Sequence, residues 1–146
     1  GSPTQLESGA APYRWSAAYP ALYAVHFETA LIRIRTEDGL TAWGESQAPL
    51  APPVVCAIID HLLAPLLTGQ TFGGSRQEIA DWWLRLYSAM RVRGQTGGFM
   101  LDAISGLDLA LWDLAGKMAG RPVSKLIAEA PRPAAKPKAK TDKKRK

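Results

Sequence analysis

Carboxylate and imidazole side chains are the first candidates for chemistry in this chain. Asp102, Asp108 and Asp113 fall in one stretch, but spacings of six and five residues scatter them around a helix. We therefore interpret them as solvated or capping residues. His26 and His61 have no acidic partner at the spacing of a metal site. The residues predict no catalytic group and no metal ligands in this chain.

A glycine-rich segment and a basic tail are the next candidates. Gly94-Gln95-Thr96-Gly97-Gly98 precedes a helix pattern, but it lacks the G-K-[ST] ending and a preceding strand of a phosphate loop. Residues 129–146 hold eight Lys/Arg and two acidic residues, a net charge of +6. Because the whole chain carries +5, residues 1–128 carry −1. The tail could bind nucleic acid or an acidic membrane, but it has no aromatic residues for stacking. We favour a solvated extension.

The helix pattern after the glycine-rich segment is the strongest in the chain. Within Met100–Val123, apolar residues recur at three- and four-residue spacing, and Gly120 with Pro122 predicts the stop. Val54–Leu67 predicts a second apolar helical face that Pro65 kinks or ends. The run from Ser75 to Glu78 is a capping box that predicts the start of a third helix. Core positions on these helices are assigned to Trp82, Trp83 and Trp112, and Cys56 is expected to be a buried, inert thiol.

Strand patterns precede the helices. Apolar and polar residues alternate in Val25–Thr36, which predicts a strand. Asp38-Gly39 predicts a hairpin turn, because both positions can take positive φ, and Leu40–Glu45 is the predicted paired strand. Pro12–Tyr23 is rich in aromatic residues and reads as an ordered loop. The expected fold class is α+β: a small antiparallel β-meander followed by a three- to four-helix bundle, with the helices on one side of the sheet.

Composition limits the organisation of the chain. Its 146 residues suit one domain, and the expected divisions are a loop or disordered segment at 1–12, a folded domain at 13–128 and a disordered Lys/Pro/Ala-rich tail at 129–146. No apolar run approaches the roughly 18–20 residues of a membrane span, and no signal-peptide pattern is present. We expect a cytoplasmic protein.

Two long segments resemble a known family. The run A-I-S-G-L-D-L-A-L-W-D-L-A-G-K-M-A-G-R-P-V (Ala103–Val123) is similar to the last long helix of the N-terminal capping domain in the enolase superfamily, in its mandelate racemase/muconate-lactonizing branch. A-L-I-R-I-R-T-E-D-G-L-T-A-W-G-E-S (Ala30–Ser46) is similar to the second and third strands of that domain, and His61–Gln70 to the segment after its first helix.

The resemblance implies a function. In that family the domain closes over a catalytic barrel, which supplies acid/base residues and binds Mg²⁺ while a proton is removed next to a carboxylate. Two loops of the domain determine substrate specificity, and by position they correspond here to Pro12–His26 and Ser46–Pro53. The resemblance thus implies a specificity role for five side chains: Tyr13, Trp15, Tyr19, His26 and Gln47.

The chain also departs from the family. Gly1–Ala11 offers no counterpart of the opening strand, and after Ile127 no barrel follows. Our first hypothesis is a capping domain of a racemase or acid-sugar dehydratase, truncated and inactive without its barrel, that needs no cofactor of its own. The alternative is a stand-alone interaction module that covers its barrel-facing surface with a partner or by self-association. Weak nucleic-acid binding through the tail is the third hypothesis.

Overall fold

The structure is a computed structural model that describes residues 13–48 and 50–128. Four strands come first: β1 (Tyr13–Ser16), β2 (Ala21–Ala24), β3 (Ala30–Arg35) and β4 (Thr41–Ser46). The helical elements follow in the order α1 (Pro52–Ile58), the π-helical turn η1 (Ile59–Leu63), α2 (Ala64–Leu67), α3 (Arg76–Arg91), α4 (Phe99–Ala119) and α5 (Val123–Ala128). Antiparallel strands followed by helices confirm the predicted α+β class.

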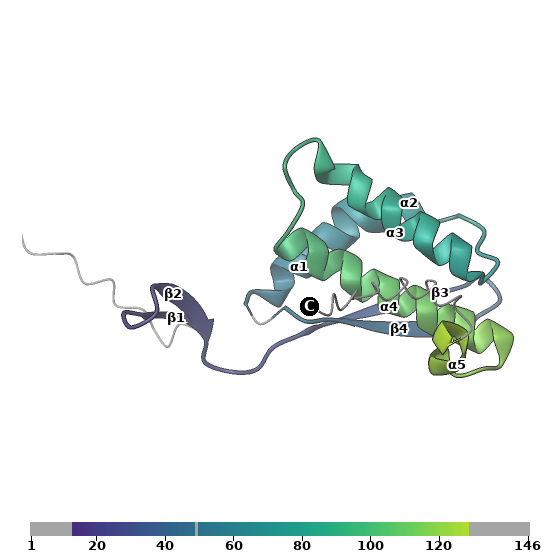
Figure 1. Cartoon of the computed structure of the whole chain (residues 1–146), viewed down its shortest axis with the longest axis horizontal. Coiled ribbons are helices and arrows are strands. Elements are labelled where there is room, and N and C mark those ends of the chain that lie inside the picture. Colours follow the sequence, from purple (N-terminus) through teal and green to yellow (C-terminus); the bar gives the residue numbers. More distant parts are fainter. Residues whose placement is uncertain (1–12, 49, 129–146) are drawn as a thin grey trace, which may run out of the picture.

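Helix α4 is the centre of the packed part of the molecule. It lies between the β3–β4 ribbon on one side and α1 and α3 on the other (Figure 1). Its buried apolar side chains recur at the predicted three- and four-residue spacing, and they are Met100, Ala103, Ile104, Leu107, Ala110, Leu111, Leu114 and Ala115. Helix α4 ends with Gly120 in the left-handed region (φ 60°), as the sequence predicts.

Two glycines let α4 approach the ribbon closely. A Cβ on Gly44 of β4 would lie 2.0 Å from the carbonyl oxygen of Gly106, and a Cβ on Gly106 would lie 2.4 Å from Cδ1 of Ile32. The fully buried Ser46 has its hydroxyl satisfied at the same interface, because it donates to the carbonyl oxygen of Asp102. The ribbon and helix therefore pack through backbone as well as through side chains.

The β3–β4 ribbon has the predicted turn at Asp38-Gly39. The N–H of Gly39 donates to the carbonyl of Thr36 (3.0 Å), and Thr36 in turn donates to Leu40 (2.9 Å). Of the two turn residues, only Gly39 takes positive φ (93°). The Asp38 carboxylate accepts a hydrogen bond from the Thr36 hydroxyl, and this bond lowers the pKa of Asp38. The predicted strand over Val25–Thr36 is too long, because β3 begins at Ala30.

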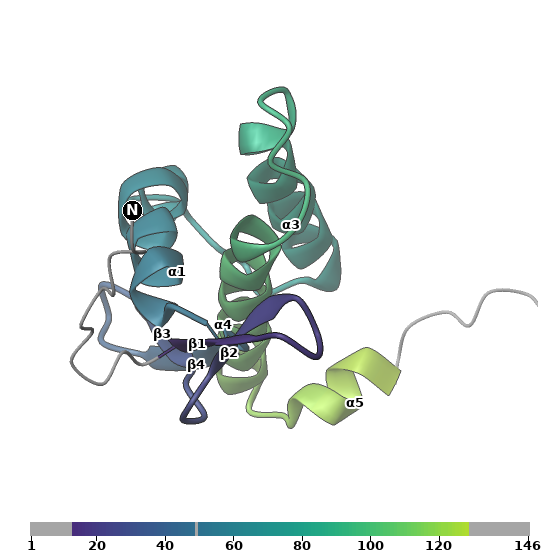
Figure 2. The same ribbon diagram turned by 90° about the vertical axis from the view of Figure 1, so that its left-hand side faces the viewer.

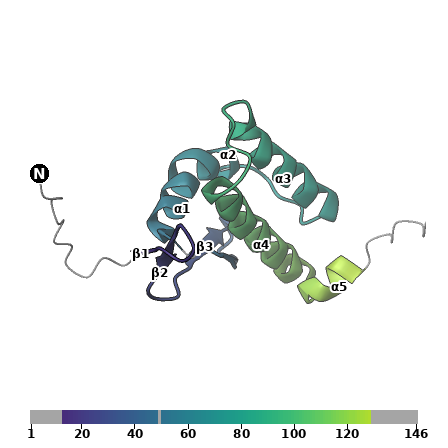
Figure 3. The same cartoon turned by 60° about the vertical axis from the view of Figure 1, so that its left-hand side comes forward.

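The expectation of a loop over Pro12–Tyr23 is wrong. Strands β1 and β2 form a second antiparallel hairpin, with Trp15 opposite Leu22 and Tyr13 opposite Ala24. The described strands thus form two two-stranded sheets, β1–β2 and β3–β4. Figure 1 shows the β1–β2 hairpin projecting from the packed body, and Figure 3, like Figure 1, shows it at the end of the molecule where α1 begins.

The segment from α1 to α2 forms the predicted apolar helix. Val55, Ile59 and Leu63 are buried, and the helix ends at Leu67, shortly after Pro65. A π-helical turn at η1 precedes the proline, and such wide turns are a known way for a helix to absorb a local irregularity. The prediction of a buried thiol is wrong: Cys56 is exposed, because the apolar face runs through Val55 and not through its neighbour.

Helix α3 begins at the predicted capping box. Glu78 N–H donates to the hydroxyl of Ser75 (3.2 Å), and the N–H of Ser75 donates back to the Glu78 carboxylate (3.1 Å). The backbone N–H groups of Gly73 and Ser75 lower the pKa of Glu78. The core assignment of Trp83 is wrong: its side chain is exposed and stacks on Tyr87, with ring centroids 5.2 Å apart. The large ring of Trp82 is half-buried against Ile79 and Leu111.

Some predictions lie outside the described residues. These are the loop at 1–12 and the disordered basic tail at 129–146. Within the described part of the chain, no helix is both long and apolar enough to cross a membrane.

Candidate functional site

The β1–β2 hairpin exposes large apolar side chains. Tyr19 is 80% and Trp15 63% exposed, and Leu22, which pairs with Trp15, is also exposed. The hydroxyl oxygen of Ser16 accepts a hydrogen bond from Tyr19 N–H (3.2 Å) and stabilises the turn between the strands. Exposed aromatic groups on a small ordered element are typical of a surface that contacts a ligand or another domain. Figure 2 shows this hairpin lying across the end of the body that faces the viewer.

Tyr13 connects the hairpin to the body. Its hydroxyl donates to Oε2 of Glu28 (2.9 Å) and accepts from the backbone N–H of Ala51 (2.6 Å). Partial burial and donation to Glu28 raise the pKa of Tyr13, and the Ala51 N–H opposes this effect. The phenol therefore stays neutral at physiological pH and serves as a hydrogen-bonding group.

Ala51 is held in an unusual backbone conformation. It is the N-cap of α1 with φ 51° and ψ 56°, the only non-glycine with positive φ in residues 13–48 and 50–128. The proline that follows disfavours the right-handed helical region for Ala51. Its carbonyl accepts from Val54 N–H (2.9 Å), while its own N–H points to Tyr13.

An open hollow of about 960 Å³ lies beside this contact. Its lining includes Tyr13, Phe27, Glu28, Cys56, Asp60 and His61. Among the five predicted specificity residues, only Tyr13 lines it. Sequence reasoning missed Glu28 and Ala51, because no local motif indicates a contact between residues that lie 38 positions apart.

The remaining predicted specificity residues are not brought together. His26 follows β2 and Gln47 follows β4, and both side chains are exposed. Trp15 and Tyr19 lie on the hairpin, and both side chains are mostly exposed. A specificity role for these residues stays a prediction.

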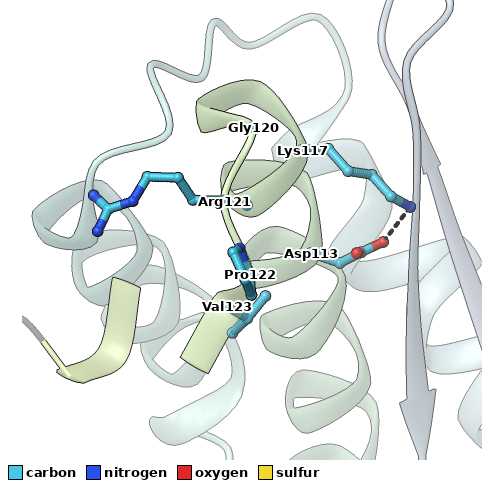
Figure 4. A pocket seen from close by; sticks show the side chains of 7 residues that line it. Asp113, Lys117, Gly120, Arg121, Pro122 and Val123 are labelled. Carbon is cyan, nitrogen blue, oxygen red and sulfur yellow. Dashed lines mark hydrogen bonds and ion pairs between the residues drawn. The ribbon is translucent and has the colours of Figure 1, made fainter. Parts of the chain in front are cut away.

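The carboxylates of α4 have structural partners. Asp113 accepts from the backbone N–H of Trp43 (2.8 Å) and from Nζ of Lys117 (2.7 Å), and Lys117 also donates to the carbonyl of Thr41 (2.9 Å). Burial opposes ionisation of Asp113, but these donors outweigh it and lower its pKa. Figure 4 shows the Asp113–Lys117 pair beside a small pocket formed with Arg121, Pro122 and Val123. Asp113 thus joins the helix to β4, which corrects the prediction of a merely solvated or capping residue.

The described residues do not fit a magnesium site. Asp108 is half-buried, which raises its pKa, and it accepts a hydrogen bond from Trp112. Asp113 is engaged with the ribbon. No group of three or more His, Cys, Asp or Glu side chains in residues 13–48 and 50–128 could hold a metal ion. Oxygen-rich ligand sets of the kind Mg²⁺ needs are therefore not assembled in this part of the chain.

Comparison with known proteins identifies the family. Residues 13–128 match the mandelate racemase/muconate lactonizing enzyme, N-terminal domain. The chain belongs to this family, and the predicted resemblance to the enolase superfamily is confirmed.

Individual relatives agree with this assignment. A D-galactonate dehydratase family member of Paenibacillus sp. strain JDR-2 is 38% identical over 105 residues, which are 71% of this chain and 24% of the relative. An enolase-superfamily member from Agrobacterium tumefaciens has a TM-score of 0.74 with 37% identity over 82% of this chain and 30% of its own. A mandelate racemase/muconate lactonizing protein from Paracoccus denitrificans, complexed with magnesium, has a TM-score of 0.59 with 29% identity over 82% of this chain and 29% of its own. The chain thus spans about a quarter of the length of the first relative.

Proposed function

We propose that this chain is the capping, substrate-specificity domain of a magnesium-dependent racemase or acid-sugar dehydratase. The reaction would be proton abstraction next to a carboxylate, carried out on a barrel domain. The observation that supports this most is the exposed aromatic hairpin on a family-typical body: among the residues that the structure describes, nothing buries Trp15 or Tyr19, which are 63% and 80% exposed. An acid-sugar substrate beneath them would supply C–H and hydroxyl groups that aromatic rings and phenols bind well.

Magnesium belongs to the barrel in this proposal. The solved Paracoccus denitrificans relative is complexed with magnesium, whereas in this chain Asp113 joins α4 to the ribbon and Asp108 accepts a hydrogen bond from Trp112 of the same helix. When bound, the ion would stabilise negative charge that develops on the substrate carboxylate. The residues of this chain would exclude water from the barrel mouth and orient the substrate. Without a barrel the chain would be inactive.

A domain exchange tests this function. Residues 13–128 would replace the matching domain of the Paenibacillus dehydratase relative, and kcat/KM would be measured over a panel of acid sugars. We expect the preference among substrates to change with the domain, and Trp15→Ala or Tyr19→Ala in the chimera to alter that preference by roughly tenfold. Trp83→Ala, which removes an exposed aromatic residue from α3, is the matched control. Unchanged preference in both hairpin variants would refute the proposal.

Self-association is a second candidate, favoured by the outer face of the β3–β4 ribbon. Leu31 is 67% and Trp43 49% exposed there, and Arg33 lies over the Trp43 ring at 5.9 Å from its centroid. Apolar groups of this size on an antiparallel ribbon are suited to a second copy or a partner protein. Light scattering should then report a dimer that Leu31→Asp converts to a monomer. A monodisperse wild-type monomer that binds no apolar dye would count against this candidate.

A further inference from the structure

Two segments that are distant in the sequence meet at one hydroxyl group. Tyr13 lies at the start of the β1–β2 hairpin, and Ala51 lies within the second predicted specificity segment, Ser46–Pro53, directly before α1. The Tyr13 oxygen is 2.6 Å from the Ala51 nitrogen and 2.9 Å from Oε2 of Glu28. Glu28 belongs to the linker between β2 and β3, so three separate stretches converge on the phenol.

We propose that Tyr13 is a positioning residue that couples the hairpin to the Leu50–Ala51 segment, so that the two segments move as one unit. The coupling is inferred from the pair of hydrogen bonds at the Tyr13 hydroxyl, and it does not depend on the function of the domain. Its consequence for substrate selection rests on the proposed function, because only a capping domain would present both segments to a substrate.

The chemistry of the hydroxyl suits this role. A phenol has one O–H to donate and lone pairs to accept, and here it uses the donor on Glu28 and an acceptor site on Ala51 at the same time. Loss of the oxygen would leave a half-buried carboxylate and a backbone N–H without this partner. Such unpaired groups rearrange towards water, because an unsatisfied buried polar group is costly.

The conformation of Ala51 makes the contact sensitive to its partner. Alanine takes the left-handed region at an energetic cost that glycine avoids. With φ at 51°, Ala51 directs its N–H at Tyr13. Without the phenol oxygen, the backbone at Leu50–Ala51 would lose a contact that favours this conformation, and the segment would sample others.

The hairpin depends strongly on this contact. Among the residues that the structure describes, the Tyr13 hydroxyl makes the side-chain hydrogen bond between the hairpin and the body, at Ala51, and a second one to Glu28 of the linker. The large side chains of the hairpin are mostly exposed and contribute little buried surface. The remaining connection is the covalent linker to β3.

Hydrogen exchange on the full chain tests the coupling. In Tyr13→Phe we expect the amide of Ala51 and the amides of residues 14–19 and 21–24 to exchange about tenfold faster, while those of α4 between Ile104 and Leu111 keep their wild-type rates. Tyr19→Phe is the matched control, because it removes a hydroxyl from the same hairpin without touching Glu28 or Ala51. Unchanged exchange at Ala51 in Tyr13→Phe would overturn the proposal. So would equal acceleration in α4, because it would show a general loss of stability.

A second variant separates the two hydrogen bonds. Glu28→Gln keeps an acceptor for the Tyr13 hydroxyl, so exchange should change by less than twofold, whereas Glu28→Ala should accelerate exchange in the hairpin more than at Ala51. If both Glu28→Ala and Glu28→Gln exchange at wild-type rates, the hydrogen bond from Tyr13 to Glu28 does not contribute to the coupling, and that part of the proposal is refuted.

Kinetics in the domain-exchange chimera give the functional readout. Tyr13→Phe should raise KM for the preferred acid sugar about tenfold and change kcat by less than twofold, because the barrel residues stay in place. Faster exchange with unchanged KM would refute the proposed function and leave the coupling intact. Unchanged exchange would refute the coupling whatever the kinetics show.

Discussion

The β1–β2 hairpin and the body centred on α4 are stabilised in different ways. The body buries a continuous apolar face, from Ala30 and Ile32 of the ribbon through α4 to Leu86 of α3. The hairpin exposes its apolar residues, and one phenol hydrogen-bonds it to the body at Ala51 and to the linker at Glu28. Burial of apolar surface is cooperative and hard to undo locally, whereas a few polar contacts exchange readily with water. A rigid base with a loosely attached aromatic element suits a domain that adapts to a ligand.

The largest expected effect is in the body. Ile104→Ala should destabilise the chain by about 3 kcal/mol, because the side chain is fully buried in the middle of α4 and its removal leaves a cavity. Urea denaturation followed by circular dichroism measures the change. Leu84→Ala on the exposed side of α3 is the control and should change stability by less than about 0.5 kcal/mol. Similar losses in both variants would mean that α4 is not the core.

The close contact between β4 and α4 gives the next effect. Gly44→Ala should cost about 2 kcal/mol, because the new Cβ would lie 2.0 Å from the Gly106 oxygen and 2.7 Å from the Ala110 nitrogen, and both atoms are backbone. The same denaturation experiment applies. Gly97→Ala, where a Cβ meets nothing within 4 Å, is the matched control. A neutral Gly44→Ala would show that the ribbon can move away from the helix freely.

A smaller effect is expected at the polar contact between α4 and the ribbon. The pKa of Asp113 is lower in the folded state than in the unfolded state. Ionised Asp113 therefore adds to the free energy of unfolding at pH values above its unfolded pKa, about 3.9. This stabilisation is lost as the pH falls through the folded-state pKa. Asp113→Asn keeps an acceptor for Trp43 but loses the charge that attracts Lys117, and should cost about 0.5 kcal/mol at pH 7. Denaturation midpoints between pH 7 and 3 should converge for wild type and variant. Glu37→Gln, at an exposed carboxylate in the turn between β3 and β4, is the control. A constant difference for Asp113→Asn, or the same pH dependence in the control, would contradict this account.

The smallest expected effect on stability is in the hairpin. Trp15→Ala should change the free energy of unfolding by less than about 0.5 kcal/mol, although it removes a large side chain, because that side chain is mostly exposed. Trp82→Ala, which empties a half-buried site against Ile79, should cost clearly more. If Trp15→Ala were the more damaging substitution, the hairpin would be part of the core and would be stabilised in the same way as the body.

Much of the fold could be predicted from local patterns. The capping box at Ser75 and Glu78, the glycine stop at Gly120 and the turn at Gly39 each depend on residues within a few positions of one another. Long periodic patterns such as that of α4 also identify their own buried face. The predictions that failed concern residues whose exposure depends on what lies opposite them. Trp83 continues the helical spacing of α3, yet it is 39% exposed in the part of the chain that the structure describes.

The candidate site shows the same division. Aromatic residues around Tyr13 could be recognised as a group from the sequence, and the resemblance to the family implied a role for them. Their arrangement as a hairpin could not be predicted, because short strands with small residues between aromatic ones carry a weak pairing signal. The partners of Tyr13 could not be predicted either.

The sequence by itself determined the main helices of this protein and the buried face of α4, because these depend on periodic patterns and on local capping and turn residues. The family was indicated by the resemblance of Ala30–Ser46 and Ala103–Val123 to its members. The tertiary structure decided that Tyr13 meets Glu28 and Ala51, that Asp113 joins α4 to β4, and that Cys56 and Trp83 face outward. The physical reason is that a hydrogen bond or an exposed face between segments distant in sequence depends on how whole elements pack, and no short run of residues encodes that.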